Sequence, residues 1–200
     1  MKTENIIFDF GGVLVDWNPR YLYKDHFQNE NEMEYFLKNI CTDEWNLEQD
    51  KGRSLIEGTV LLQHKFPAFH SMIQLFYDKW EIMLKSDIPE TVSLLYKLKA
   101  KYKIYGLTNW SAETISIAYD RFLFFKEFDG IVVSGQEKII KPSKQIYQLL
   151  LDRYSLKAEN TIFIDDNINN IKAAEELGLY AIHFKNPGQL ETKLSSLNVI

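Results

Sequence analysis

Thr161-Ile162-Phe163-Ile164-Asp165-Asp166-Asn167 is an apolar run that ends in two adjacent carboxylates. Its first four residues are typical of a short buried strand. The residues that follow carry Ile168 and Ile171 on one helical face and stop at Gly178, as expected for a helix of about three turns. Adjacent carboxylates at the end of an apolar strand repel each other unless a cation or a donor lies between them. The segment therefore predicts a strand, a charged strand end and a helix.

The same alternation extends to the N-terminal end and to the second half of the chain. Further buried strands are predicted at residues 5–8, 103–107, 131–133 and 180–184. Pro89 and Pro142 each suit the first position of a helix, and apolar residues at helical spacing follow both. Strands that alternate with helices in this way predict an α/β fold, with a parallel sheet covered by helices on both faces.

Residues 18–88 interrupt this alternation. They show no convincing strand and are rich in helical spacing, as in Ile73, Phe76, Tyr77 and Trp80. We therefore expect an all-helical insertion at 18–88, placed between the first strand and the rest of an α/β core made of 1–17 and 89–200.

Composition and charge narrow the class of protein. The chain is 46% hydrophobic and 26% charged, which is typical of a folded globular protein. A net charge of −5 without lysine or arginine clusters argues against nucleic acid or an anionic membrane as a partner. Cys41 is the single cysteine, so no disulfide forms within the chain, and we expect it to be a small buried residue. No segment is apolar enough to span a bilayer, and we expect a cytoplasmic protein.

Four predicted strand ends carry polar residues: Asp9, Thr108-Asn109, Lys141 and Asp165-Asp166. Taken singly, most have ordinary explanations, since Asp and Thr often cap turns and helices. In an open parallel sheet, however, ligands bind beyond the carboxyl ends of the strands. Two acidic ends, a hydroxyl end and a lysine gathered there favour a metal-assisted phosphoryl transfer.

The chemistry gives each residue a task. Asp9 would attack phosphorus as a nucleophile and form an acyl phosphate that water resolves. Mg²⁺, which prefers hard oxygen ligands, would be reached by Asp9 and Asp166 and would offset the charge of the substrate. Thr108 and the backbone N–H of Asn109, near a helix N-terminus, would hold phosphate oxygens. Lys141 would stabilise the charge that grows on them.

These motifs resemble the haloacid dehalogenase superfamily in its phosphatase branch. The resemblance covers nearly the whole chain, from the loop at 9–13 to Ile164-Asp165-Asp166-Asn167, and within the superfamily the chain is similar to bacterial sugar-phosphate phosphatases such as α-glucose-1-phosphate phosphatases. It implies a Rossmann-like sheet ordered 5-4-1-2-3, a mobile helical cap and an aspartyl-phosphate intermediate. It also implies a metal held by Asp9, the Gly11 carbonyl and Asp166, and a small phosphorylated metabolite as substrate for a monomer or homodimer.

Two positions depart from the family pattern. Phosphatases of the family carry a second Asp two residues after the nucleophile as general acid, and here that residue is Gly11. Loss of a general acid costs roughly 10²–10⁴-fold in rate unless another group replaces it, and Asp16, Glu48 and Asp50 are the candidates. Asn170 stands where many relatives have Asp, and we expect its amide to hold a metal-bound water.

Two tryptophans are candidates for substrate binding. Trp45 lies in the polar segment 44–53, which would suit recognition of a sugar-like leaving group, although the same segment suits a capped turn with Trp45 in the core. Trp110 directly follows Thr108-Asn109, so it is expected to wall the pocket rather than pack under the helix.

Two other functions fit part of the pattern. A 2-haloacid dehalogenase uses the same carboxylate without a metal. Without a metal to bind, the adjacent carboxylates of Asp165-Asp166 would have no function in such an enzyme. An inactive binding module would tolerate Gly11. Receiver domains share the residue types, but there the acidic pair comes first in the chain and the domain is shorter.

Overall fold

Five parallel strands form the main sheet in the computed structural model, which describes residues 2–200. The strands are β1 (Asn5–Phe8), β4 (Lys103–Thr108), β5 (Gly130–Val133), β6 (Thr161–Asp165) and β7 (Tyr180–His183). Their order across the sheet is β5-β4-β1-β6-β7. When these five strands are numbered along the chain, the order reads 5-4-1-2-3 from the β7 edge, so the predicted α/β topology is confirmed.

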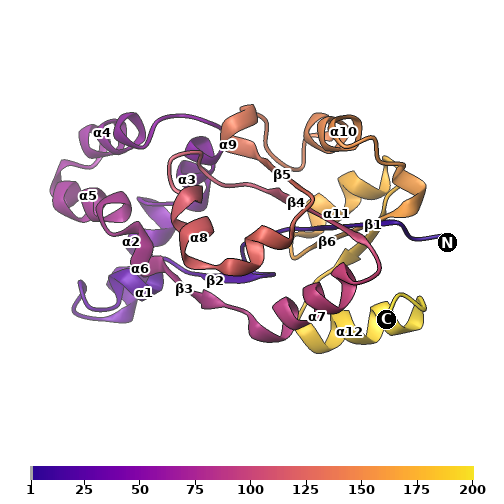
Figure 1. Ribbon diagram of the computed structural model, residues 1–200. Coiled ribbons are helices and arrows are strands. Elements are labelled where there is room, and N and C mark those ends of the chain that lie inside the picture. The colour runs from indigo at the N-terminus through magenta and orange to yellow at the C-terminus, as the bar shows by residue number, and fades with distance from the viewer. Residues whose placement is uncertain (1) are drawn as a thin grey trace.

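Helices cover both faces of this sheet (Figure 1). Ile6 and Phe8 of β1 belong to one apolar cluster and Ile7 to the other, because successive side chains of a strand point to opposite faces. The first face packs against α7 (Pro89–Lys99), α8 (Ile115–Arg121) and α12 (Pro187–Ser196), and the second against α10 (Lys144–Arg153) and α11 (Ile168–Glu175). The short α9 (Ser134–Glu137) and the 3₁₀ turns Leu123–Glu127 and Ala158–Asn160 complete this part.

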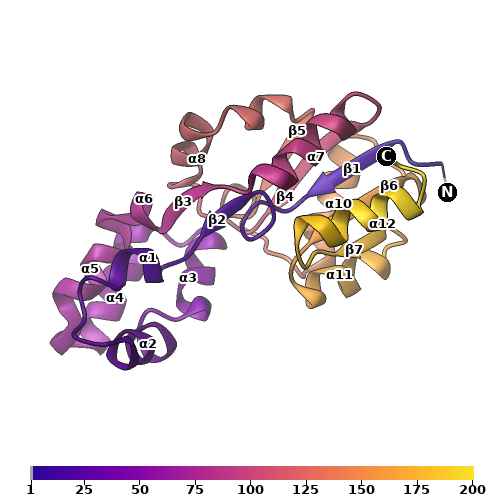
Figure 2. The same cartoon turned by 90° about the horizontal axis from the view of Figure 1, so that it is seen from below.

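Six helices lie in the sequence between β2 (Val15–Trp17) and β3 (Leu84–Asp87) and form a separate lobe beside the sheet (Figure 2). They are α1 (Arg20–Tyr23), α2 (Glu30–Asn39), α3 (Asp43–Asp50), α4 (Leu55–Lys65), α5 (His70–Asp78) and α6 (Trp80–Met83), with a 3₁₀ turn at Pro67–Phe69. The side chains of Asn29, Thr42 and Ser54 cap α2, α3 and α4 by accepting a backbone N–H. Buried aromatic rings such as Phe36 and Phe76 fill the space between the helices.

A two-stranded antiparallel ribbon connects the helical lobe to the main sheet. It pairs β2 (Val15–Trp17) with β3 (Leu84–Asp87). The expectation of no strand within 18–88 is therefore wrong at β3. The sequence Leu-Lys-Ser-Asp gives no apolar run that would signal a strand, and pairing with β2 stabilises it instead. The division into 1–17 with 89–200 and 18–88 stays a prediction.

The first residue of a helix is a proline, as predicted, at Pro89 but not at Pro142. Pro89 is the first residue of α7, as predicted. Pro142 lies outside α10, which begins at Lys144 after Ser143. The helix after β4 begins only at Ile115, so the expected helix N-terminus does not lie beside Asn109. Within residues 2–200, none of the helices has the length and apolar character needed to traverse a bilayer.

Candidate functional site

The register of the sheet gathers the predicted site residues at one edge. Phe8 of β1 pairs with Gly106 of β4 on one side and with Ile164 of β6 on the other. The residues just beyond these pairs, including Asp9 and Asp165, therefore lie side by side at the carboxyl ends of parallel strands. This edge is where the sequence predicted a site.

Lys141 lies at the centre of the cluster and is only 2% exposed. Its Nζ is 2.9 Å from Asp9 Oδ1 and 2.6 Å from Asp165 Oδ2, and it donates to the Leu107 carbonyl at 2.9 Å. The Asn109 side chain fixes the Lys141 backbone, because its Oδ1 accepts the Lys141 N–H at 2.8 Å and its Nδ2 donates to the Lys141 carbonyl at 3.0 Å. The ammonium group thus lies between two carboxylates. The side chain of Asn109, which the sequence predicts to bind phosphate, fixes the segment that carries it.

The two adjacent aspartates have different surroundings. Asp165 is fully buried, and its carboxylate accepts from Lys141, from the Asn167 backbone N–H at 2.8 Å and from Asn170 Nδ2 at 3.0 Å to each oxygen. Asp166 is exposed on one side and has no such set of donors among the described residues. The Asn170 amide therefore supports Asp165, whereas the sequence suggests a metal-bound water as its partner.

Asp9, Asp165 and Asp166 form a group that suits a hard cation. Each offers a carboxylate oxygen, and these oxygens lie within 4.8 Å of one another. Gly12 has a φ of +71°, and a Cβ built there would come within 2.5 Å of Asp166 Oδ2, so glycine lets this carboxylate lie against the loop of Asp9. Since Asp165 is already satisfied by its donors, Asp9 and Asp166 are the residues whose oxygens fit a cation.

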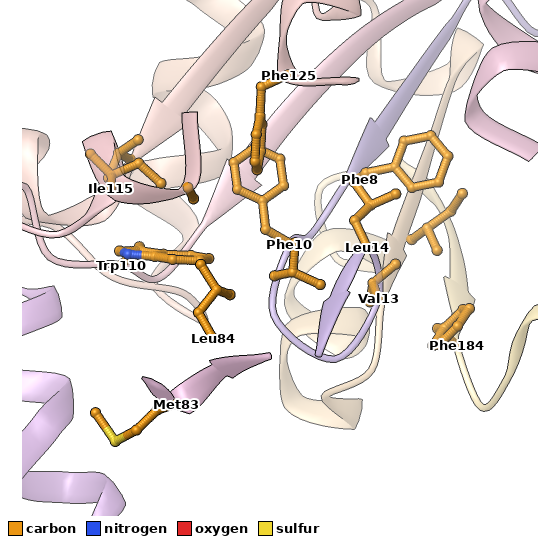
Figure 3. Close-up of a cluster of buried hydrophobic side chains, with 14 of the residues drawn as sticks. Phe8, Phe10, Val13, Leu14, Met83, Leu84, Trp110, Ile115, Phe125 and Phe184 are labelled. Atoms are coloured by element: carbon orange, nitrogen blue, oxygen red, sulfur yellow. The ribbon is translucent and has the colours of Figure 1, made fainter. Parts of the chain in front are cut away.

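The loop that carries Asp9 is held by an aromatic anchor. The Phe10 N–H donates to Asp9 Oδ1 at 2.7 Å, and the Phe10 ring packs edge-on against Phe125 at 4.9 Å between ring centroids (Figure 3). A Cβ on Gly106 would lie 2.4 Å from the end of the Phe10 ring, so glycine in β4 leaves the space that this ring fills. The packing fixes the direction of the Asp9 carboxylate.

The charges of the cluster are not balanced. Burial raises the pKa of Asp9 to about 8, the negative charge of Asp165 adds to this rise, and Lys141 opposes it. Burial and the charge of Asp165 also raise the pKa of Asp166. Burial lowers the pKa of Lys141, but Asp165 and Asp9 outweigh it and the pKa is raised. One ammonium therefore faces three carboxyl groups, and a bound cation would favour their ionised forms.

A cavity of about 110 Å³ lies next to this cluster, between the sheet edge and the helical lobe. One water molecule needs about 10–15 Å³ of such space, so the cavity admits a small polar group. Both parts of the molecule line it: Gly11, Trp17, Asn46, Asp50, Tyr77, Trp80, Asn109, Trp110, Ser111 and Thr114. Four of these side chains are aromatic, and two are amides.

The two predicted substrate-binding tryptophans have different positions. Trp110 lines the cavity, packs against Trp80 at 5.4 Å between ring centroids and donates its indole N–H to Thr114. Trp45 does not line it, because its indole N–H donates to the Gly58 carbonyl at 3.0 Å and its ring packs against Phe76. Its position matches the alternative that places Trp45 in the core.

Three aromatic residues of the cavity wall, Trp17, Tyr77 and Trp80, were not predicted as site residues. In the sequence, Tyr77 and Trp80 belong to an apolar helical stripe, and that pattern does not separate them from the core. Trp17 is the most informative of the three, because its indole nitrogen is buried and no described residue accepts its N–H. A hydrogen-bond donor of this kind suits an acceptor on a ligand.

Of the three candidates for the missing acid, Asp50 alone lines the cavity. Burial raises the pKa of Asp50 to about 7, and the backbone of Ser111 opposes the rise. The Asp16 carboxylate accepts the Tyr21 hydroxyl at 2.7 Å, and Glu48 lies on α3 away from the cavity lining.

Comparison with known proteins gives a family model and several relatives. The model described as a haloacid dehalogenase-like hydrolase matches residues 3–178. The chain is 29% identical to the sesquiterpene phosphatase astK of Aspergillus oryzae, over 88% of this chain and 87% of that protein. It is 22% identical to the phosphorylated carbohydrates phosphatase of Thermotoga maritima, over 90% and 84%. It is 40% identical to acyl-CoA dehydrogenase family member 10 of Mus musculus, but spans 19% of that protein.

Solved structures share the fold. A HAD family enzyme of Bacteroides thetaiotaomicron, solved as a magnesium complex, superposes with a TM-score of 0.72 at 23% identity, over 92% of this chain and 94% of the other. This likeness agrees with the sheet order and with helices on both faces of the sheet.

Proposed function

We propose, because the chain belongs to the haloacid dehalogenase-like hydrolases, that it is an Mg²⁺-dependent phosphatase acting on a small phosphorylated metabolite through an aspartyl phosphate on Asp9. Two relatives that are phosphatases, both matching most of the length of this chain, support a hydrolase of phosphate esters. The observation that carries the proposal is the buried Lys141, 2.9 Å from Asp9, with Asp166 beside them. This combination provides a nucleophile, a fixed cation and a place for a second one.

The residues of the sheet edge divide the work. Asp9 attacks phosphorus, and the Phe10 N–H together with Lys141 directs its carboxylate. Lys141 also stabilises the negative charge on the transferring phosphoryl group. The Thr108 hydroxyl and the Asn109 backbone N–H hold phosphate oxygens, while the Asn109 side chain keeps Lys141 in place.

Mg²⁺ would be held by Asp9, Asp166 and the carbonyl of Gly11. The ion would neutralise the charge of the phosphate and orient it for in-line attack. The close carboxylate oxygens and the space left at Gly12 support this assignment. A magnesium complex in an enzyme of the same fold is consistent with it.

The substrate would place its organic part in the cavity under the helical lobe. The ring of Trp110 suits stacking against a hydroxylated, sugar-like group. The buried N–H of Trp17, which no described residue accepts, would donate to one of its oxygens. Residues 18–88 would act as the cap that closes over this group. Trp45 would contribute by packing within the cap, without touching the substrate.

The alternatives make different demands on the site. A 2-haloacid dehalogenase needs no cation, so it gives no reason for the proximity of Asp9 and Asp166. An inactive binding module needs no raised carboxyl pKa beside a buried lysine.

We further propose a cytoplasmic monomer or homodimer that binds neither nucleic acid nor membranes.

Hydrolysis of 4-nitrophenyl phosphate with and without Mg²⁺ tests the proposal, followed by a screen of phosphorylated sugars and other small phosphate esters. We expect phosphate release that requires Mg²⁺. Halide release from a 2-haloacid without metal would favour the dehalogenase. Absence of both activities would favour the binding module.

A further inference from the structure

We propose that Asp50, at the C-terminal end of α3, is the general acid of the reaction and supplies the proton that the residue at position 11 cannot. The inference rests on the proposed function and deepens it. It assigns a catalytic residue to the helical lobe, which otherwise has only a binding role.

Asp50 occupies the right cavity. It lines the same space as Gly11, which is two residues after the nucleophile, and as Asn109, which fixes Lys141. The cavity adjoins the loop of the nucleophile at Gly11, so in this proposal the leaving group of a phosphate bound at Asp9, beside Lys141, extends into it. The leaving oxygen would then lie in the cavity that Asp50 lines.

A chain of hydrogen bonds within the helical lobe positions the carboxyl group. Gln49 Nε2 donates to the Tyr77 hydroxyl at 2.9 Å, and this hydroxyl donates to Asn46 Oδ1 at 2.9 Å. Asn46 Nδ2 then donates to Asp50 Oδ2 at 3.2 Å. Asn46, Tyr77 and Gln49 are neutral, and the Arg53 guanidinium bonds to the Gln49 end of the chain and not to the carboxyl group, so the chain orients Asp50 without placing a cation on it.

The end of α3 is also attached to the α/β core. The Ser134 hydroxyl donates to the Asp50 carbonyl at 2.5 Å and accepts the Trp110 N–H at 2.9 Å. Ser134 itself is fully buried at the end of β5. Asp50 is therefore fixed relative to the sheet edge, as a group that transfers a proton must be.

The protonation state suits an acid at neutral pH. Burial raises the pKa of Asp50 to about 7, with the Ser111 backbone opposing the rise. The groups that titrate on the elements around it do not provide a countercharge. Tyr77 on α5 stays neutral, because burial raises its pKa, and the Arg53 guanidinium is bonded to Gln49 and the Trp45 carbonyl. Burial thus favours the protonated form of Asp50 far above the pH at which an exposed carboxyl group loses its proton.

The remaining charged groups belong to the facing core elements. Glu113, in the loop after β4, accepts the Leu55 N–H. Lys138, at the end of α9, lies against Gly52. Across the cavity, the Asp9–Lys141 pair belongs to the nucleophile side, where substrate and metal would bind.

Asp50 takes part in both halves of the proposed reaction, the formation of the aspartyl phosphate and its hydrolysis. In the first, an oxygen of Asp9 forms a bond to phosphorus, the bond to the ester oxygen breaks, and that oxygen takes the proton of Asp50 and leaves as an alcohol. In the second, Asp50 accepts a proton from water whose oxygen bonds to phosphorus, and the bond to Asp9 breaks. Phosphate is released, and both carboxyl groups return to their starting forms.

The test compares two leaving groups in Asp50→Asn. An alkyl phosphate needs a proton on its leaving oxygen, whereas 4-nitrophenolate leaves as an anion. We expect kcat to fall roughly 10²–10⁴-fold with the alkyl ester and less than about 10-fold with the aryl ester. The wild-type kcat for the alkyl ester should fall above a pKa near 7, and this limb should be lost in the variant.

Glu48→Gln is the matched control, because it removes a carboxylate from the same helix outside the cavity lining, and it should leave both rates unchanged. Thermal unfolding of each variant checks that the fold is kept. If kcat of Asp50→Asn fell equally with the two esters, or did not fall with either, the role of Asp50 would be overturned. Turnover by the wild type would still support the phosphatase in that case. No turnover of either ester by the wild type would overturn the proposed function and this inference together.

Discussion

The sheet edge holds the fully buried carboxyl group of Asp165 and the helical wall of the cavity holds the half-buried one of Asp50, and the two regions treat the charge differently. Asp165 at the sheet edge is surrounded by the Lys141 ammonium, an amide and a backbone N–H. Asp50 in the helical wall has the Asn46 amide, the Ser111 backbone and aromatic neighbours, but no ammonium group bonded to it. Burial is favourable for a carboxylate only with donors or a cation, and otherwise the group keeps its proton. The sheet edge is thus suited to bind anions and metal, and the helical wall to hold a proton and an organic group.

The largest effect should come from the nucleophile. Asp9→Asn keeps the shape and a hydrogen-bonding oxygen but cannot form the acyl phosphate, so turnover should fall by on the order of 10⁴-fold or more. Steady-state rates with 4-nitrophenyl phosphate and Mg²⁺ measure this loss, and circular dichroism checks the fold. A variant that retained a tenth of the activity would show that Asp9 is not the nucleophile.

The contrast between the two carboxyl groups also predicts a pH-dependent stability. Since the pKa of Asp50 rises from 3.8 to about 7 on folding, the folded state binds more protons between pH 4 and 7, and stability falls as pH rises through that range. Asp50→Asn removes this penalty and should be more stable than wild type at pH 8 by about 2–4 kcal/mol, but not at pH 4. Urea unfolding with EDTA measures the difference. A constant gap between the two proteins at all pH values would contradict the assignment.

A substitution at Asp166 tests cation binding at the sheet edge. Asp166→Ala removes an oxygen ligand, and the Mg²⁺ concentration for half-maximal activity should rise by roughly 10²-fold. Titration of the rate with Mg²⁺ gives the value. Asn167→Ala, which alters a neighbouring residue outside the proposed ligands, serves as control. An Asp166→Ala enzyme with unaltered Mg²⁺ dependence would contradict the ligand assignment.

Moving the acid to the sheet edge would sharpen the comparison further. A Cβ built on Gly11 meets no atom within 4 Å, so the loop has space for a side chain. Gly11→Asp in an Asp50→Asn background should restore alkyl ester hydrolysis by about 10-fold over the single variant. Gly11→Asn in the same background adds the bulk without the proton and should restore nothing. Equal rates for the two double variants would argue against a transferable acid.

The smallest effect is expected at the indole of Trp17. Its buried N–H has no acceptor among residues 2–200, and a substrate oxygen would provide one. Trp17→Phe keeps the aromatic wall and should raise KM for a hydroxylated substrate about 2–10-fold, the range of one hydrogen bond. KM for 4-nitrophenyl phosphate should change less. A uniform change for both substrates would indicate lost packing instead.

Local patterns were sufficient to predict much of the fold and the main cluster. The apolar strands are short and continuous, and their polar ends fall at the same edge once the strands are parallel. This is why the residue pattern predicts that Asp9 and the Asp165-Asp166 pair lie together. Lys141 does not lie at the end of β5, and the segment after α9 brings it to the same edge. The antiparallel pairing at β3 could not be predicted, because Leu84–Asp87 has no pattern of its own and depends on a distant partner in the chain, Val15–Trp17.

The sequence by itself indicated which chemical groups meet at the sheet edge, since local patterns predict the parallel strands with their polar ends and the family resemblance implies the strand order. Only the tertiary structure separated Asp165, which is bound by donors, from Asp166, which lacks such a set among the described residues. It also selected Asp50 from three candidate acids and placed Trp45 in the core. The physical reason is that burial and hydrogen-bond partners depend on how distant segments pack, and no local pattern encodes that contact.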